Sequence, residues 1–288
     1  MKVAYVGLGS MGAPQARLIA RSGLELAVYD PYPPALKAFE GLARIAGSAA
    51  DAARDAEIAC VCVRDDQQVQ AVVLGENGLA SGLSPGSLLL IHSTIKIETL
   101  HKLNSELAPR RIALVDAPVS RTRRTDDEPF VFTMMGGAAA DVERARAVVS
   151  TFSTGSDHIG PLGAGMATKI ANNMIAWVQI VVGTQATNLA ALHAVPYEKL
   201  HAVLKSNGNL TPTMGAMLDG KQKVRPGENP TYDEFVASQA GIGEKDLSLA
   251  IDCGASVGLD MEMVVEAQKL VRTAMTQPLA QISGVRSA

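Results

Sequence analysis

The chain has 288 residues, of which 47% are hydrophobic, enough for one large domain or two ordinary ones. Its formal net charge of -3, from 26 basic and 29 acidic residues, provides no sustained basic field for nucleic acid. Small molecules and copies of itself are therefore the expected partners, and no nucleic acid. The first residues enter an apolar strand pattern without the regions that a signal peptide requires, which predicts a cytoplasmic protein.

The first half of the chain alternates short apolar runs with helix-length segments. The apolar runs predict strands at residues 2–8, 24–30, 43–47, 57–63, 87–93, 112–118 and 130–137. The intervening segments predict helices, among them 11–22, 65–74, 96–107 and 139–152. Continuous apolar strands joined by helical crossovers predict an α/β Rossmann domain with a doubly wound, mostly parallel sheet.

The pattern changes near residue 163, where long helix-period segments replace the strands. The expected organisation is a Rossmann domain over residues 1–162 and an all-helical domain over residues 163–288. From Ile170 to Tyr197 there is no Asp, Glu, Lys or Arg, but polar residues interrupt the run too often for lipid. This stretch predicts no membrane span but a helix buried inside protein that also packs against a second subunit.

A glycine-rich loop follows the first predicted strand. The segment "GLGSMG" supplies Gly7, Gly9 and Gly12 in the spacing G-x-G-x-x-G, directly before a predicted helix. Glycines at this spacing permit a tight turn, close approach of the backbone to a pyrophosphate, and close helix-to-strand packing. The backbone amides here, including those of Ser10 and Met11, are expected to hold the diphosphate of a dinucleotide.

Asp30 ends the second predicted strand, where a Rossmann fold presents an acid to the adenosine ribose. A carboxylate there accepts from the 2'-hydroxyl and repels a 2'-phosphate, so NAD is predicted rather than NADP. The alternative is that Asp30 only caps the turn into "PYPP". The agreement of loop, strand and spacing favours the cofactor role.

Two further strand ends are expected to line the same crevice, because ligands of open parallel sheets bind beyond the carboxyl ends of the strands. Val63 and Arg64 follow one strand, and Thr94 follows the next. Thr94 either hydrogen-bonds the cofactor or caps the helix after it, and its position favours the cofactor. His92 is interpreted as structural, since no partner for a catalytic triad is identifiable.

The cysteines give no sign of a disulfide or a metal site. Cys60, Cys62 and Cys253 are odd in number, and the first two alternate within an apolar run, which predicts buried thiols. No cluster of His and Cys accompanies them. The sequence therefore predicts no metal.

Five segments, in chain order, resemble the β-hydroxyacid dehydrogenase family: "VGLGSMGAPQARLIARSG", "STIKIETL", "DAPVS", "GAGMATKIANN" and "KDLSLA". This family includes 3-hydroxyisobutyrate dehydrogenase and tartronate semialdehyde reductase, with 6-phosphogluconate dehydrogenase a longer relative. The resemblance implies a Rossmann domain and a helical domain, assembled as a homodimer or homotetramer through the helical domain. It also implies hydride transfer between NAD(P) and a short 3-hydroxy acid or its semialdehyde, and Asp30 favours NAD(H).

The resemblance also implies roles for single residues. The lysine of the motif G-x-G-x-x-x-K-x-x-N-N, the family's catalytic acid/base, matches Lys169, and the second asparagine, which helps to hold the substrate, matches Asn173. The serine of the substrate loop matches Ser120. The lysine that approaches the cofactor matches Lys245.

The chemistry of Lys169 can also be argued without the family. Oxidation of an alcohol needs a base for the hydroxyl proton, and a lysine serves when burial disfavours its charged form. Helical spacing sets Lys169 and Asn173 one turn apart on one face. The alternative is a lysine that extends to the helix end and an asparagine that caps or packs. The glycine loop upstream favours catalysis.

The substrate loop departs from the family pattern. Where the family continues with two glycines whose amides bind a carboxylate, this chain has Arg121 and Thr122. Arg121 either binds an anionic group of the substrate or belongs to a solvated loop of mixed charge. We favour the first for Arg121, and with it Thr122, and the second for Arg123 and Arg124.

Two other functions remain as alternatives. An imine reductase shares this architecture, but such enzymes usually lack the motif lysine, so Lys169 argues against it. An NAD(H)-binding sensor or scaffold that has lost catalysis is motivated by the altered substrate loop.

Overall fold

The computed structural model describes residues 1–281 except 124, 126, 225 and 226. It divides into two compact units, Met1–Lys169 and Ile170–Ala288. Helix α8 (Ala164–Leu192) begins in the first unit and continues into the second. The predicted fold class, a Rossmann sheet followed by a helical part, is confirmed.

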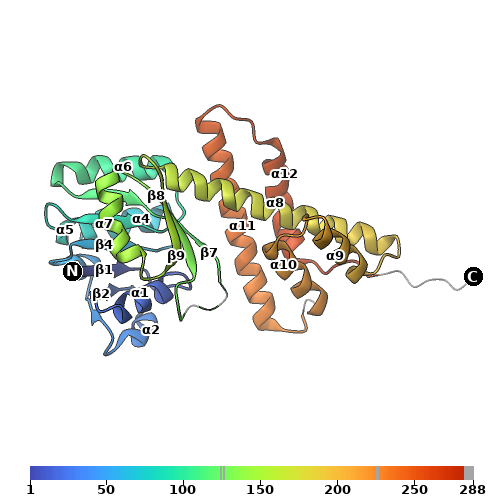
Figure 1. Cartoon of the computed structure of the whole chain (residues 1–288), viewed down its shortest axis with the longest axis horizontal. Helices are drawn as coiled ribbons and strands as arrows, with labels where there is room; N and C mark the ends of the chain where they lie inside the picture. Colours follow the sequence, from blue (N-terminus) through green and yellow to red (C-terminus); the bar gives the residue numbers. More distant parts are fainter. Residues whose placement is uncertain (124, 126, 225–226, 282–288) are drawn as a thin grey trace, which may run out of the picture. The chain divides into compact units, whose positions relative to one another are not determined.

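In the described part of the first unit, nine strands form one sheet (Figure 1). The parallel part has the order β3-β2-β1-β4-β5-β6. Its strands are β1 (Lys2–Val6), β2 (Glu25–Tyr29), β3 (Arg44–Ile45), β4 (Ile58–Val61), β5 (Leu88–Ile91) and β6 (Ala113–Asp116). The order reverses between β1 and β4, which is where doubly wound sheets bind dinucleotides.

Beyond β6 the sheet changes direction. Strand β8 (Val131–Gly136) pairs antiparallel with both β6 and β7 (Val119–Arg121), and parallel with β9 (Ser153–Gly160). Strands β7 and β9 were not predicted. β7 is only three residues long, and β9 carries polar residues and glycines with no buried residue, so neither has the apolar pattern of a core strand.

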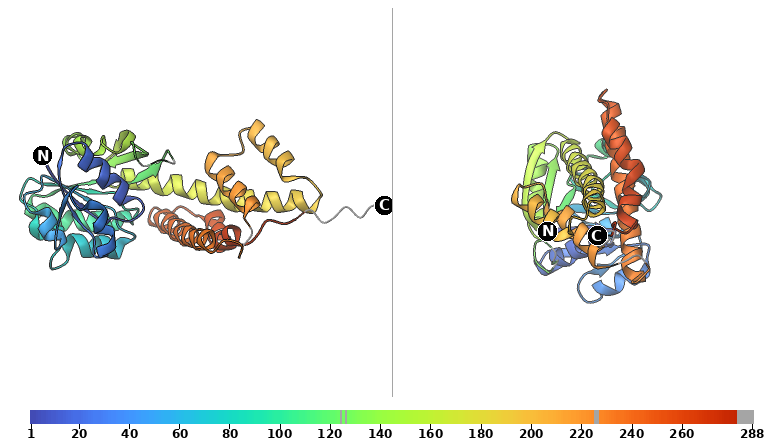
Figure 2. Two further views of the ribbon diagram at one scale, coloured as in Figure 1. Left: turned by 90° about the horizontal axis from the view of Figure 1, so that it is seen from below. Right: turned by 90° about the vertical axis from the view of Figure 1, so that its right-hand side faces the viewer.

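Helices cover both faces of this sheet (Figure 2). α1 and α7 lie on one face, and α4 and α6 on the other. The helices are α1 (Gly12–Arg21), α2 (Pro33–Leu36), α3 (Ala49–Ala53), α4 (Asp66–Leu74), α5 (Leu79–Gly82), α6 (Ile97–Leu107) and α7 (Ala139–Val149), with 3-10 turns η1 (Lys37–Phe39) and η2 (Ala108–Arg110).

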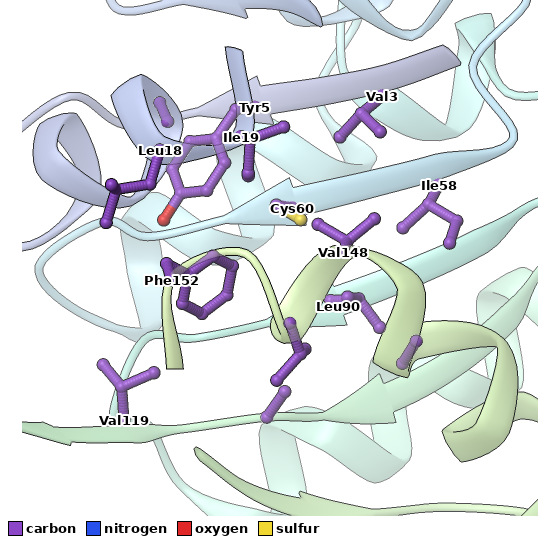
Figure 3. Close-up of a cluster of buried hydrophobic side chains, with 14 of the residues drawn as sticks. Val3, Tyr5, Leu18, Ile19, Ile58, Cys60, Leu90, Val119, Val148 and Phe152 are labelled. Carbon is purple, nitrogen blue, oxygen red and sulfur yellow. The ribbon is translucent and has the colours of Figure 1, made fainter. Parts of the chain in front are cut away.

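The hydrophobic core of the first unit lies between the sheet and helices α1 and α7 (Figure 3). Tyr5 and Leu90 from the strands meet Ile19 of α1 and Val148 of α7, and Phe152 closes the cluster. All five side chains are fully buried. This packing fixes the strand ends from which the candidate site is built.

The second unit is helical. It contains the rest of α8, followed by α9 (Tyr197–Ser206), α10 (Pro212–Lys223), α11 (Pro230–Ser256) and α12 (Glu262–Thr276). Helices α11 and α12 pack along each other. A small core of Met214, Leu218 and Leu279 joins α10 to the segment that follows α12.

Helix α8 is less buried than expected. Trp177, Ile180 and Val181 are covered, but Ile175 and Leu189 are 55% and 62% exposed in the single chain. The expectation of a helix buried inside protein therefore holds for one face only. By length and composition alone, α8 is the helix among the described residues that could cross a bilayer. Hydrogen bonds join this helix to two buried carboxylates, which are described below.

Candidate functional site

The glycine loop joins β1 to α1 with little room to spare. Gly7 has a φ of +95°, and a Cβ there would lie 2.3 Å from the carbonyl oxygen of Cys62. A Cβ on Gly12 would lie 2.0 Å from the carbonyl oxygen of Gly7. A Cβ on Gly9, by contrast, would meet no described atom within 4 Å. The fold itself thus requires the first and third glycines, while the second leaves open space above the backbone for a ligand.

Asp30 lies directly after β2, as the sequence predicted, and holds the glycine loop. Its Oδ2 accepts a hydrogen bond from the amide of Leu8 at 2.7 Å, and its Oδ1 accepts one from the amide of Tyr32 at 2.8 Å. Asp30 therefore does cap the turn that follows it. A carboxylate offers about four acceptor positions, so these two bonds leave capacity for ribose hydroxyls.

The ends of β4 and β5 are bonded to each other. The amide of Val63 donates to Oγ of Ser93 at 2.8 Å, and the amide of Arg64 donates to Oε1 of Gln68 at 3.1 Å. His92 is buried, and its Nδ1 lies 2.7 Å from the carbonyl oxygen of Ala117. Burial lowers the pKa of His92 to about 4, which keeps the ring neutral at pH 7, in line with a structural role.

Thr94 is half-buried beside this pair of strand ends. The N-cap residue of α6 is Lys96, without a side-chain cap. The first turn of α6 is instead bonded by Asp66, whose Oδ1 accepts from the amide of Lys96 at 3.0 Å and from Oγ1 of Thr99 at 2.5 Å. Thr94 lies two residues before this N-cap position.

The loop predicted to bind substrate overlaps β7. Ser120 is half-buried, and the exposed Arg121 lays its guanidinium over the Phe130 ring, 4.7 Å from the centroid. Nη2 of Arg121 lies 3.8 Å from Sδ of Met11, in the glycine loop. The Thr122 hydroxyl donates to the carbonyl of Phe130 at 3.0 Å, across the connection between β7 and β8.

The charged residues that follow Arg121 behave as a surface loop in their described part. Arg123 pairs with Glu128 at 3.1 Å, and both side chains are at least half exposed. Arg124 and Asp126 lie outside the described residues. Arg121 thus differs from Arg123, because Arg121 lies beside the glycine loop.

Lys169 lies in the second turn of α8 and is 9% exposed. The first turn of this helix is bonded to Asp116, a fully buried residue at the end of β6. Oδ1 of Asp116 accepts from the amide of Gly163 at 2.7 Å, and Oδ2 accepts from the amide of Met166 at 2.6 Å. Anions are favoured at a helix N-terminus by its unpaired amides and its dipole. Asp116 therefore fixes the start of the helix that carries Lys169.

The sequence analysis missed this role of Asp116. The signal was an acid between apolar residues at the end of a predicted strand, in the motif "DAPVS". Burial raises the pKa of Asp116 to about 6, against the opposing effect of its backbone hydrogen bonds. Burial therefore disfavours the charged form of this carboxyl group, and its two backbone hydrogen-bond donors stabilise that form.

In the second unit, two predicted residues meet at a carboxylate that was not predicted. Nδ2 of Asn173 donates to Oδ2 of Asp246 at 2.7 Å. Nζ of Lys245 lies 3.1 Å from Oδ1 of the same residue. Trp177, also unpredicted, donates its indole N–H to Oδ2 at 3.1 Å. The only available signal for Asp246 was its place beside the lysine of the "KDL" motif.

Among the residues that the structure describes, no group of three or more His, Cys, Asp or Glu side chains could hold a metal ion. The expected absence of a metal remains a prediction. Cys60 is fully buried, and burial raises the pKa of the half-buried Cys62 to about 11, so these thiols stay protonated at pH 7.

Comparisons with known proteins agree with the arrangement of the loop and the sheet. Residues 2–160 match the NAD binding domain of 6-phosphogluconate dehydrogenase. An uncharacterised oxidoreductase of Mycobacterium tuberculosis is 32% identical over 91% of this chain and 89% of its own. A 3-hydroxyisobutyrate dehydrogenase of Pseudomonas aeruginosa is 31% identical over 86% of this chain and 84% of its own.

A solved structure with the same fold is that of a 3-hydroxyisobutyrate dehydrogenase from Mycobacterium tuberculosis with L-serine. The TM-score is 0.82 at 22% identity, and the match covers 98% of this chain and 97% of that one.

The open space above Gly9 leads to a first prediction. Gly9→Ala is expected to raise the Kd of NADH at least about tenfold, because the methyl group enters the space left for the ligand, with little change in stability. Gly12→Ala is the control, expected to lower the free energy of unfolding by about 1–3 kcal/mol through overpacking. NADH titration and urea unfolding measure the two effects. Unchanged NADH affinity in Gly9→Ala would show that the space is not the cofactor site.

The buried Asp116 leads to a second prediction, on pH. Its pKa is raised from 3.8 to about 6, so the native state binds this proton more tightly than the unfolded chain. The free energy of unfolding of the wild type minus that of Asp116→Asn is thus expected to be greatest at low pH. It should fall as pH rises from 3.8 to about 6, by at most about 1.4 kcal/mol per unit, and level off at higher pH. Urea unfolding across this range tests it, and a difference that grows with pH contradicts it.

Proposed function

Because this chain belongs to the β-hydroxyacid dehydrogenase family, we propose that it transfers a hydride between NAD(H) and a short 3-hydroxy acid or its semialdehyde. The chain is an oxidoreductase with an NAD-binding domain. The observation that carries the proposal is the buried Lys169, on a helix whose first turn is bonded to Asp116. A buried amine held in a fixed place can exchange a proton with a substrate.

We assign the cofactor as NAD rather than NADP. The support is the carboxylate of Asp30 at the end of β2, which accepts from ribose hydroxyls and repels a 2'-phosphate. Gly7, Gly9 and Gly12, with the amides of Ser10 and Met11, receive the diphosphate. We also assign Val63, Arg64 and Thr94 to cofactor binding. Lys245 is assigned to the cofactor because the matching lysine of the family approaches it.

The reaction needs one proton carrier from the protein. The bound nicotinamide supplies the hydride acceptor for oxidation and the hydride donor for reduction. During oxidation, Nζ of Lys169 in its neutral form takes the hydroxyl proton as the carbonyl forms. During reduction, the ammonium form returns that proton to the carbonyl oxygen. Asn173, one helical turn later on α8, holds the substrate.

We further propose that the substrate carries an anionic group bound by Ser120 and Arg121, with Thr122 supporting the loop through its bond to Phe130. The guanidinium fork suits a carboxylate, sulfonate or phosphate. Its position beside Met11 of the glycine loop supports this role over that of a purely solvated charge. The 3-hydroxyisobutyrate named for the Pseudomonas aeruginosa relative is itself a carboxylate.

The helical unit is proposed to form the homodimer or homotetramer contact. Ile175, Val182 and Leu189 recur every seven residues along α8 and are all more than half exposed. A row of apolar side chains at that spacing on one helix face matches the surface buried when helices pair.

Lys169→Ala tests the mechanism. The variant is expected to lose about 100- to 10,000-fold in kcat while binding NADH as the wild type does. The assay follows NADH absorbance with a panel of 3-hydroxy acids and semialdehydes, repeated with NADPH, and uses the exposed Lys199→Ala as the control. Turnover that survives Lys169→Ala overturns the assigned role of the lysine. Tight NADH binding without turnover of any member favours a sensor. Cyclic imines are assayed separately, and turnover of these alone favours an imine reductase.

Arg121→Ala tests the anionic substrate. It is expected to raise KM about tenfold or more, because one charge-assisted contact is worth roughly 1.5–3 kcal/mol, and to leave NADH affinity unchanged. Arg123→Ala is the matched control, two positions along the same loop and paired with Glu128. An unchanged kcat/KM in Arg121→Ala contradicts the proposal.

A further inference from the structure

Asp246 is a carboxylate buried within the helical unit. It lies on α11 and is 3% exposed. Its Oδ2 accepts from both the Asn173 amide and the Trp177 indole. Its Oδ1 is ion-paired with Nζ of Lys245 at 3.1 Å. The carboxylate therefore connects two residues of α8 with one of α11.

A charge in such a place is costly for stability. Burying a carboxylate costs several kcal/mol unless donors and an opposite charge compensate it, and apolar side chains would fill the same volume without that cost. Asp246 is compensated by two N–H donors and one ammonium. Two of these three partners, Asn173 and Lys245, are residues of the proposed reaction.

The hydrogen bond to Asp246 also settles the orientation of the Asn173 amide. A carboxylate only accepts, so the group that faces Asp246 must be Nδ2. Oδ1 of Asn173 then points elsewhere and accepts from Nδ2 of Asn172 at 3.3 Å. The second N–H of the amide and a lone pair of Oδ1 are the groups that can meet a substrate.

We propose that Asp246 is a positioning residue of the reaction: it fixes the amide of Asn173 and the ammonium of Lys245, and acts on substrate through them. This inference rests on the proposed function. Asp246 itself touches no substrate, and its removal misplaces the groups that do. Misplacement of such groups by about 1 Å costs roughly 100-fold in rate.

Trp177 makes the contact observable, because the chain has a single tryptophan and its indole bonds to Asp246. Asp246→Asn keeps the size of the side chain and removes the charge. It is expected to lower kcat about 100-fold and to shift the Trp177 emission. Glu234→Gln, the same chemical change at an exposed position of α11, is the control and should alter neither.

A double-mutant cycle separates positioning from a general effect on the fold. If Asp246 acts through Asn173, adding Asp246→Asn to Asn173→Ala should cost at least about fivefold less in kcat than adding it to the wild type. Full additivity, or unchanged kcat and kcat/KM in a folded Asp246→Asn, overturns the proposal. If Asp246→Asn does not fold, the proposal is tested with Asn173→Ala instead. An unchanged Trp177 emission in that variant would mean that the Asn173 amide and the Trp177 indole do not share the Asp246 carboxylate, and it would overturn the proposal.

The wild type in the same assays distinguishes the two levels of failure. If it turns over no substrate of the panel, the proposed function fails and the role of Asp246 fails with it. If it does turn one over while Asp246→Asn matches it, only the role of Asp246 fails.

Discussion

One buried carboxylate accepts hydrogen bonds from two backbone amides and thereby sets the start of helix α8. Asp116 binds the amides of Gly163 and Met166, and this places Lys169 in the following turn. The constraint extends to two glycines, because a Cβ on Gly136 or Gly165 would lie 2.4 Å or 2.9 Å from a carboxylate oxygen. Both the sheet end and the helix start are thus shaped around this one group.

Asp30 and Asp246 use the same physical device. Each carboxylate accepts N–H groups from a segment distant in sequence, and each thereby holds a residue that the proposed reaction needs. Asp30 holds the glycine loop at Leu8, and Asp246 holds Asn173. Charge-assisted hydrogen bonds are strong and directional, so they can offset the cost of burial while fixing geometry.

The core elements were predictable because burial leaves a local pattern. Strands β1, β2, β4 to β6 and β8 appear as apolar runs, and the glycine loop appears at its full spacing. Strands β7 and β9 left no such pattern, since pairing with β8 rather than burial makes them strands. The charge-free run predicted a helix correctly but overestimated its burial, because absence of charge does not say which face is covered.

The sequence by itself determined the Rossmann sheet, the glycine loop, the acid at the end of β2, and the motif that contains Lys169 and Asn173. These depend on residues close together in the chain. Only the tertiary structure showed what holds them, because Asp116 lies 47 and 50 residues from its partners, and Asp246 lies 73 residues from Asn173. A buried carboxylate is recognisable as a positioning group only when its donors are known, and folding rather than local sequence brings those donors to it.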